Sequence, residues 1–262
     1  MGERREPIDR ARRVARMTFA IGTLLVVEAV VFGLAALPVV LLWRLVPRAP
    51  VARALWQPVA LALALGPGYL VFAVLLMIFS ALATRVLGWR TPRDAGLRIA
   101  DLGWPLLRWV RGIAVSHVVR VFAGALLRAT PLWTFYLRLG GARLGRRVYV
   151  NSLALTDYNL LEFGEGVVIG SDVHLSGHTV EDGVVRTGAV RLGRGVTIGV
   201  GSVIGIDVEI GAGAQVGALS LVAKHSRLAG GRTYVGVPAR LLGADAATQD
   251  RGDAASAIVS RR

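Results

Sequence analysis

The sequence predicts an all-β solenoid of stacked coils that follows an α-helical hairpin long enough to cross a membrane. Three observations carry this prediction: a six-residue period from residue 144 onward, two long apolar stretches before residue 90, and a strongly apolar composition. The chain is 54% hydrophobic with a mean hydropathy of +0.56, which is too apolar for an ordinary soluble domain.

The two apolar stretches cover residues 17–46 and 55–87. Each is long enough to span a bilayer, which takes roughly 20 apolar residues. A cleaved signal peptide would have a shorter apolar region followed by a polar sequence, whereas here a second apolar run begins within a few residues. We therefore expect a retained two-helix transmembrane hairpin over residues 17–90.

Arginines flank this hairpin on both sides. They are concentrated in the basic N-terminus, residues 1–16, and occur again after the second apolar stretch. By the positive-inside rule both flanks are expected to be cytoplasmic, which predicts a multi-pass protein of the cytoplasmic membrane with its C-terminal half in the cytosol. Most of the net charge of +14 precedes residue 141, which favours membrane lipids over nucleic acid as partner.

Residues 91–139 are basic, apolar and predicted to be helical. Trp104, Trp109 and Trp133 are candidate anchors for an amphipathic, interfacial linker. The alternative is ordinary helices packed on the repeat. The chain has 0 cysteines, so disulfides, thiolate zinc sites and cysteine nucleophiles are excluded.

The period of six places an apolar residue, usually followed by glycine, at regular positions between residues 140 and 243. In a triangular coil each hexad forms one flat face, three hexads make a turn of about 18 residues, and stacking buries a continuous core. Residues 244–262 are expected to form a disordered tail. The repeating core positions are Leu144, Val150, Phe163, Ile169, Leu175, Leu192, Ile198, Ile204, Ile210, Val216, Val222 and Leu228.

This repeat and the closing segment 236–241 (GVPARL) resemble the hexapeptide-repeat acyltransferases over residues 139 to about 243. The resemblance implies a left-handed parallel β-helix, a homotrimer, and acyl-CoA donors bound between neighbouring subunits. More narrowly, two apolar spans, a helical linker and the segment 176–183 (SGHTVEDG) are similar to one of the tandem C-terminal units of ε-poly-lysine synthetases.

The stretch between Leu175 and Leu192 breaks the hexad pattern and is 17 residues long, one short of a turn, so we expect an excursion from the coil. Acyl transfer needs a base near pH 7, and His178 on this excursion is the candidate; the alternative is a solvated surface histidine. Glu181 is a candidate to orient the imidazole. His174 is a candidate second polar group at the same cleft.

A second break lies between Val150 and Phe163, where the spacing is 13 residues. Residues about one turn apart lie above one another, so Asp157 and Glu162 are candidates to approach His178. There they would polarise the imidazole or bind a cationic acceptor. Capping of an irregular coil is the structural alternative.

The resemblance implies that the last coils line the coenzyme A path, with backbone amides on the pantetheine arm and basic groups on the phosphates. Lys224 is the chain's single lysine. No metal is expected. The candidate cofactor-binding residues are Gly217, Ala218, Lys224, Gly236, Pro238 and Arg240.

Four functions are compatible with these features. The first is acyl-CoA-dependent transfer to a hydroxyl or amine. The second is amide-bond formation from an aminoacyl thioester of a cationic amino acid, with a carrier protein or peptide synthetase as partner. The third is a zinc carbonic anhydrase, which requires three histidines shared across an interface. The fourth is a non-catalytic trimeric scaffold.

Overall fold

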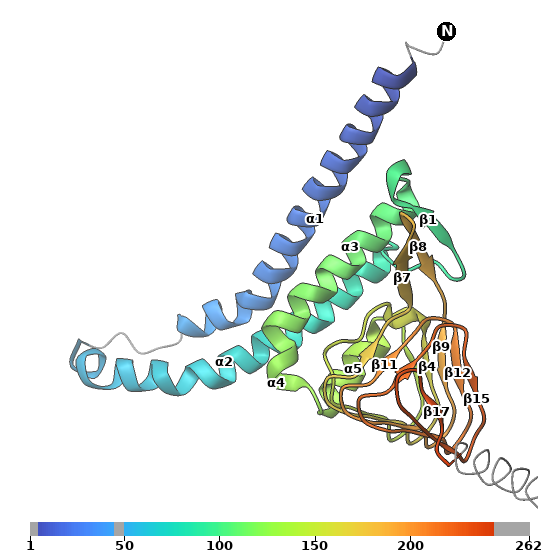
Figure 1. The fold of residues 1–262 in the computed structure, drawn as a ribbon. Coiled ribbons are helices and arrows are strands. Elements are labelled where there is room, and N and C mark those ends of the chain that lie inside the picture. The colour runs from blue at the N-terminus through green and yellow to red at the C-terminus, as the bar shows by residue number, and fades with distance from the viewer. Residues whose placement is uncertain (1–4, 45–49, 244–262) are drawn as a thin grey trace, which may run out of the picture.

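The computed structural model describes residues 5–44 and 50–243 of the chain (Figure 1). The predicted tail, 244–262, and the first four residues of the predicted basic N-terminus lie outside this description. Long helices occupy the N-terminal half and short strands the C-terminal half, where Figure 1 shows the chain winding in stacked, roughly triangular coils.

The N-terminal half is helical because its residues are apolar and carry few breakers. Pro38, Pro58 and Pro67 nevertheless lie inside the two longest helices. Pro105 and Pro131 fall in the first turns of the helices that follow, where a missing N–H costs nothing. The helical elements are α1 (Arg5–Trp43), α2 (Pro50–Val86), η1 (Ile99–Asp101), α3 (Trp104–Val119), a π-helical turn η2 (Arg120–Gly124), α4 (Ala125–Leu127) and α5 (Pro131–Leu139).

Within the described residues, three helices are long and apolar enough to cross a membrane: Arg10–Leu42, Pro58–Val86 and Trp104–Leu127. The first two coincide with the stretches identified in the sequence. The third falls in the segment where interfacial helices are expected. Trp133, a candidate membrane anchor, is fully buried and its Nε1 donates to the carbonyl oxygen of Ser152, so the anchor role is wrong for this residue.

The C-terminal half forms three sheets whose repeat strands pair in parallel. The first sheet has the order β17-β16-β13-β10-β5-β3, the second β15-β12-β9-β4-β2, and the third β14-β11-β6. Their strands are β2 (Arg143–Leu144), β3 (Tyr149–Val150), β4 (Leu161–Phe163), β5 (Val168–Ile169), β6 (His174–Leu175), β9 (Val190–Leu192), β10 (Thr197–Ile198), β11 (Val203–Ile204), β12 (Val208–Ile210), β13 (Gln215–Val216), β14 (Leu221–Val222), β15 (Arg227–Leu228), β16 (Thr233–Val235) and β17 (Arg240–Leu241). A 3₁₀ turn, η3 (Tyr158–Leu160), precedes β4.

The strand register follows the hexads. Ile198 pairs with Val216 in the next coil, and Val216 pairs with Tyr234 in the one after, a spacing of about 18 residues. The interrupted coil differs from expectation. Leu175 pairs with Ile204 and Leu192 with Ile210, so these two residues lie on different sheets, and the stretch between them is an insertion between two consecutive faces rather than a shortened turn.

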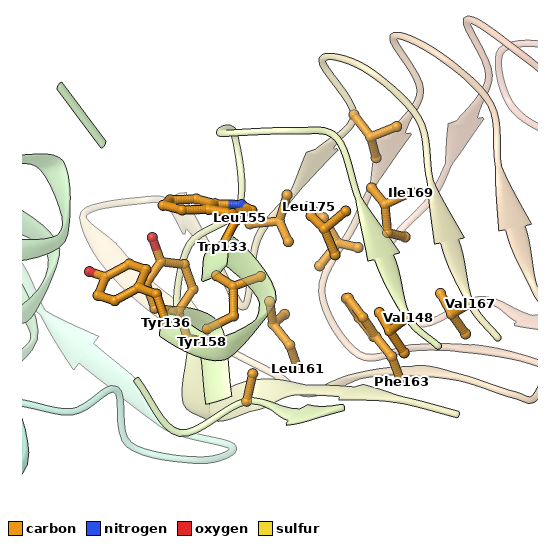
Figure 2. Close-up of a cluster of buried hydrophobic side chains, with 14 of the residues drawn as sticks. Trp133, Tyr136, Val148, Leu155, Tyr158, Leu161, Phe163, Val167, Ile169 and Leu175 are labelled. Atoms are coloured by element: carbon orange, nitrogen blue, oxygen red, sulfur yellow. The ribbon is translucent and has the colours of Figure 1, made fainter. Parts of the chain in front are cut away.

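The hexad positions fill the interior of the coils and join the aromatic residues of α5. In Figure 2, Trp133, Tyr136 and Tyr158 gather at one end of a row of aliphatic side chains that runs into the coils through Leu155 and Ile169. Trp133, Leu155 and Ile169 are completely buried. The helical and β parts therefore share one apolar core.

Both ends of α3 contact the β part. Just before α3, strand β1 (Gly96–Arg98) pairs antiparallel with β8 (Val184–Thr187). Helix α3 continues through η2 and α4 to Leu127, and two residues beyond this end the Ala129 N–H donates to the carbonyl oxygen of Val150 at 3.0 Å. The helix therefore lies along the β part (Figure 1).

Candidate active site

The excursion from the coil is a β-hairpin. Strands β7 (His178–Glu181) and β8 pair antiparallel, and β1 adds a third strand on the far side of β8. The turn uses Asp182 and Gly183, both with positive φ, a conformation that suits a two-residue hairpin turn. The chain leaves the coil at Gly177, and His178 is the first residue of β7.

His178 and Asp157 form a hydrogen-bonded pair. The His178 Nδ1 lies 2.5 Å from the Asp157 Oδ2, and the Asp157 side chain has no exposed surface, whereas that of His178 is 22% exposed. Gly177 makes this approach feasible, since a Cβ there would lie 2.8 Å from the Cβ of Asp157. Two irregular segments, one from each break in the repeat, thus meet at one contact.

The two oxygens of Asp157 serve different parts of the chain. Oδ1 accepts from the hydroxyl of Thr91 at 2.6 Å and from the indole Nε1 of Trp109 at 3.0 Å, both in the helical part. Oδ2 accepts from His178, from the backbone N–H of Gly177 at 3.2 Å and from the hydroxyl of Thr156 at 3.0 Å. The carboxylate therefore holds the hairpin, the coil and α3 together.

The electrostatics of the pair favour an ionised carboxylate. Burial alone would raise the pKa of Asp157, but hydrogen bonds from His178, Thr91 and Trp109 outweigh it, and the pKa lies below its ordinary value. An ionised Asp157 accepts the Nδ1–H of a neutral His178 and leaves Nε2 as the basic nitrogen. The Trp109 indole packs edge-on against the imidazole, with ring centroids 4.9 Å apart, and fixes its plane.

A small cavity of about 40 Å³ lies behind Asp157, between α2, α3, α5 and η3. The buried hydroxyl of Tyr158 lines it and has no hydrogen-bond partner among the described residues. A volume of this size matches about one water molecule, not an amino-acid or sugar acceptor. An acceptor must therefore reach His178 from its exposed side.

The other carboxylates predicted for the site pair elsewhere. Glu162 contacts Arg93 at 2.7 Å and Arg143 at 3.3 Å. Burial would raise the pKa of Glu162, but these arginines hold it below its ordinary value. The Glu181 oxygens lie 2.5 and 2.7 Å from the Lys224 Nζ, and this hydrogen bond lowers the pKa of Glu181.

His174 is an exposed residue of β6 that pairs with Val203 in the neighbouring coil. No contact between His174 and His178 is found among the described hydrogen bonds. Each predicted acidic residue already has a partner within this chain, so none of them is a free carboxylate for a cationic acceptor.

The residues predicted to bind coenzyme A lie in the last coils. Gly236, Pro238 and Arg240 line one surface pocket of about 330 Å³ at the end of the β part. Gly217 follows β13, and its N–H donates to the carbonyl oxygen of Tyr234. Ala218 is exposed, and Lys224 forms an ion pair with Glu181 of the hairpin.

Sequence reasoning missed the partners that the helical part gives to Asp157. Thr91 lies 66 residues from Asp157 along the chain and Trp109 lies 48 residues away. Trp109 was a candidate membrane anchor, yet its N–H points to Asp157. No local pattern marks either residue, because the contact depends on how the helices pack against the coils.

No family model matches this chain. The chain is similar to Delta-poly-L-ornithine synthetase of Acinetobacter baumannii, with 28% identity over 166 residues. The match covers 62% of this chain and only 12% of that protein. The resemblance to poly-amino-acid synthetases expected from the sequence is thus confirmed for a small part of one such protein.

Among solved structures, the chain resembles a hexapeptide-repeat acetyltransferase of Vibrio cholerae complexed with acetyl coenzyme A, at 23% identity, covering 39% of this chain and 59% of that one, with a TM-score of 0.36. It also resembles serine acetyltransferase of Brucella abortus, at 16% identity, covering 66% and 56%, with a TM-score of 0.36. These TM-scores are too low to establish the fold, which rests on the strand pairing of this chain.

Proposed function

We propose that this chain is a membrane-anchored acyltransferase that moves an acyl group from a thioester donor to a hydroxyl or amine acceptor, with His178 as general base. The contact of 2.5 Å between the His178 Nδ1 and the buried Asp157 Oδ2 carries this proposal. A buried carboxylate that orients a partly exposed imidazole is the arrangement that general-base catalysis requires.

In the proposed reaction, the His178 Nε2 removes the proton from the acceptor as its oxygen or nitrogen attacks the thioester carbonyl. The imidazolium is stabilised by Asp157, which stays ionised. The tetrahedral intermediate then collapses, the carbon–sulfur bond breaks, and the departing thiolate takes the proton from Nε2. The products are the acylated acceptor and a free thiol, and His178 returns to its neutral form.

The proposed donor is acyl-CoA, bound along the last coils. Gly217, Ala218, Gly236 and Pro238 offer a surface with little side-chain bulk, which suits an extended pantetheine arm. Lys224 and Arg240 are the basic groups proposed for its phosphates. Lys224 forms an ion pair with Glu181 of the hairpin. The proposed donor surface therefore borders the hairpin that carries His178.

The β part is proposed to be a left-handed β-helix that associates as a homotrimer. The outward side chains of its sheets differ in a way that supports association. One sheet presents a ladder of alternating charge, with Glu162 beside Arg191 and Glu209 beside Arg227. The sheet that contains β5 and β13 presents uncharged residues such as Tyr149, except for Arg240 of its edge strand β17, and uncharged surface is easier to bury between subunits.

We propose that α1 and α2 cross the cytoplasmic membrane and that α3 does not. Both ends of α3 contact the β part, so a crossing α3 would need β contacts on both sides of the bilayer. The arginines at 10–16 and 85–98 favour a cytosolic location for the N-terminus and the β part. Residues 1–16, 17–90, 91–139 and 140–243 are the proposed units of the chain.

The second candidate function is amide-bond formation from an aminoacyl thioester. The similarity to Delta-poly-L-ornithine synthetase favours it. The same base would serve, since an attacking amine also loses a proton. The two candidates differ in the donor, which is coenzyme A in the first and a carrier protein of a peptide synthetase in the second.

The proposal is tested by calorimetry of the detergent-solubilised protein with coenzyme A and acetyl-CoA, together with turnover of acetyl-CoA with a panel of amine and hydroxyl acceptors. His178→Ala is expected to keep donor binding and to lose turnover by roughly 10²-fold to 10⁴-fold. His174→Ala, which alters an exposed histidine of β6 outside the hairpin, is the matched control and should keep both.

Absence of coenzyme A binding in wild type overturns the acyl-CoA proposal. Turnover with a carrier-bound aminoacyl thioester would then support the second candidate. Full activity of His178→Ala with either donor would exclude His178 as the base.

A further inference from the structure

Arg111 is a buried arginine in the second turn of α3. Only 6% of the surface of Arg111 is exposed. Nε donates to the carbonyl oxygen of Leu107 and Nη1 to the hydroxyl of Thr23 on α1, both at 3.0 Å. The guanidinium carbon lies 4.6 Å from the ring centroid of Trp89. All of these partners are uncharged.

The site is built around this guanidinium. A Cβ at Gly112 would lie 2.6 Å from the carbonyl oxygen of Trp89, so only glycine lets the Trp89 segment lie this close to α3. That approach places the indole over Arg111. Among the side chains that the structure describes, no carboxylate forms an ion pair with Arg111, although buried charges in proteins are normally paired.

Arg111 lines an apolar crevice of about 500 Å³, whose other lining residues come from α1 and from the segment that follows α2. The walls are hydrocarbon apart from Thr23 and the guanidinium, and they include Phe19, Val26, Val27 and Leu87. Such a crevice suits a ligand with a long apolar part and an anionic end.

The depth of the crevice matches the border of a bilayer. Leu87 and Trp89 directly follow α2, which ends at Val86, so they lie at the cytoplasmic end of the second proposed span. Phe19 lies three residues after Arg16 of the basic N-terminal end of α1, and its ring packs against Trp104 at the beginning of α3.

We propose that this crevice binds an anionic phospholipid of the surrounding membrane, with a phosphate oxygen on the Arg111 guanidinium and an acyl chain along Phe19, Val26 and Val27. The lipid supplies the negative charge that Arg111 lacks within the chain. Its headgroup joins α1 to α3 and, through α3, to the residue Trp109 that holds Asp157. This inference rests on the proposed membrane insertion and is independent of the acyl-transfer reaction.

Native mass spectrometry of the full chain in a neutral detergent, with phosphatidylglycerol and phosphatidylcholine added in equal amounts, tests the proposal. Wild type is expected to retain phosphatidylglycerol preferentially, and Arg111→Gln to retain it about tenfold less. Arg108→Gln removes an exposed arginine one turn earlier and is the matched control, with retention unchanged. Arg111→Lys keeps the charge and should keep most of the preference.

Equal retention of the two lipids by wild type, or an equal loss in Arg108→Gln, would overturn the proposal. If Arg111→Gln does not fold, the melting temperature of wild type decides: a rise with phosphatidylglycerol alone supports the site, and equal rises with both lipids contradict it. Acetyl-CoA turnover in lipid-free detergent is measured separately, so failure of the lipid site and failure of the acyltransferase proposal are distinguishable.

Discussion

Asp157 connects the chemistry of the proposed site to the architecture of the chain. Its backbone has a φ of 53°, a left-handed conformation that aspartate tolerates better than most residues. The carboxylate is buried, and three parts of the chain, at Thr91, at Trp109 and at Gly177 with His178, donate hydrogen bonds to it. A residue with so many partners has little freedom to move, and its hydrogen bond to His178 restrains the imidazole as well.

Replacing this carboxylate should therefore affect catalysis more than folding. In Asp157→Asn, the amide nitrogen no longer accepts the Nδ1–H, so the imidazole adopts the wrong tautomer or orientation. We expect turnover of acetyl-CoA to fall roughly 10³-fold with donor binding preserved. Asp172→Asn, which alters an exposed aspartate of the neighbouring coil, is the control. A mutant with more than a tenth of wild-type turnover would exclude Asp157 as the orienting group.

The lowered pKa of Asp157 also predicts how stability depends on pH. Because the folded-state pKa lies below the ordinary value of 3.8, the ionised carboxylate stabilises the fold fully above about pH 5 and loses this contribution as the pH falls through the folded-state pKa. The apparent melting temperature of wild type should fall more steeply than that of Asp157→Asn between pH 5 and pH 3. Parallel curves would contradict the assignment, since the other carboxylates are common to both proteins.

Only part of this residue-level picture could be predicted from the sequence. His178 is detectable because it stands where the hexads stop, and Asp157 because it lies in the other break. The approach of Asp157 to His178, predicted from the stacking of coils, is confirmed, whereas the register of the interrupted coil was assigned incorrectly by hexad counting. Thr91 and Trp109 carry no signal, because ordinary helix and loop residues become ligands of Asp157 only through tertiary packing.

At the scale of elements, the hairpin of β7 and β8 is held from two directions. Strand β1 pairs with β8, with Leu97 opposite Val185. Helix α3 contacts the first residue of β7, because the Trp109 ring packs against His178. Since β1 and α3 are consecutive in the chain, any shift of α3 acts on the hairpin and on Asp157 together. The helical part is thereby proposed to position the base.

Two variants that each remove one hydrogen-bond donor test this positioning role. Trp109→Phe keeps an aromatic ring against His178 but removes the N–H donor to Asp157, and Thr91→Val removes the hydroxyl. We expect each to lower turnover by about tenfold to a hundredfold, because small misplacements of a catalytic group have effects of this size. The acidic limb of the pH–rate profile should move to higher pH, since a carboxylate with fewer donors stabilises the imidazolium more strongly.

Trp104→Phe is the control for this pair of variants, because Trp104 is a partly exposed tryptophan of the same helix that packs on Phe19. A loss of turnover without any change in the pH profile would indicate a general structural effect. Unchanged turnover in both Trp109→Phe and Thr91→Val would contradict the positioning role.

For the whole molecule, the coils were predictable and the placement of the helices was not. The six-residue period specifies the inward positions from Leu192 to Val222 because each hexad meets the same geometry, and all of these are buried. The helices have no such repeat. Hydropathy identifies Trp104–Leu127 as a third candidate span, although both ends of this helix contact the β part.

The number of crossings can be measured because the chain has 0 cysteines, so single cysteines introduced at chosen sites are unique labels. Arg13→Cys, Arg44→Cys and Arg194→Cys report on the two ends of α1 and on the β part, and all three positions are exposed. In intact cells, a membrane-impermeant thiol reagent is expected to label only Arg44→Cys. Arg13→Cys and Arg194→Cys should react after permeabilisation, because two crossings leave both ends of the hairpin in the cytosol. Labelling of Arg194→Cys, with Arg13→Cys protected, would instead mean that α3 crosses the membrane and that the contacts at one of its ends do not form in the bilayer.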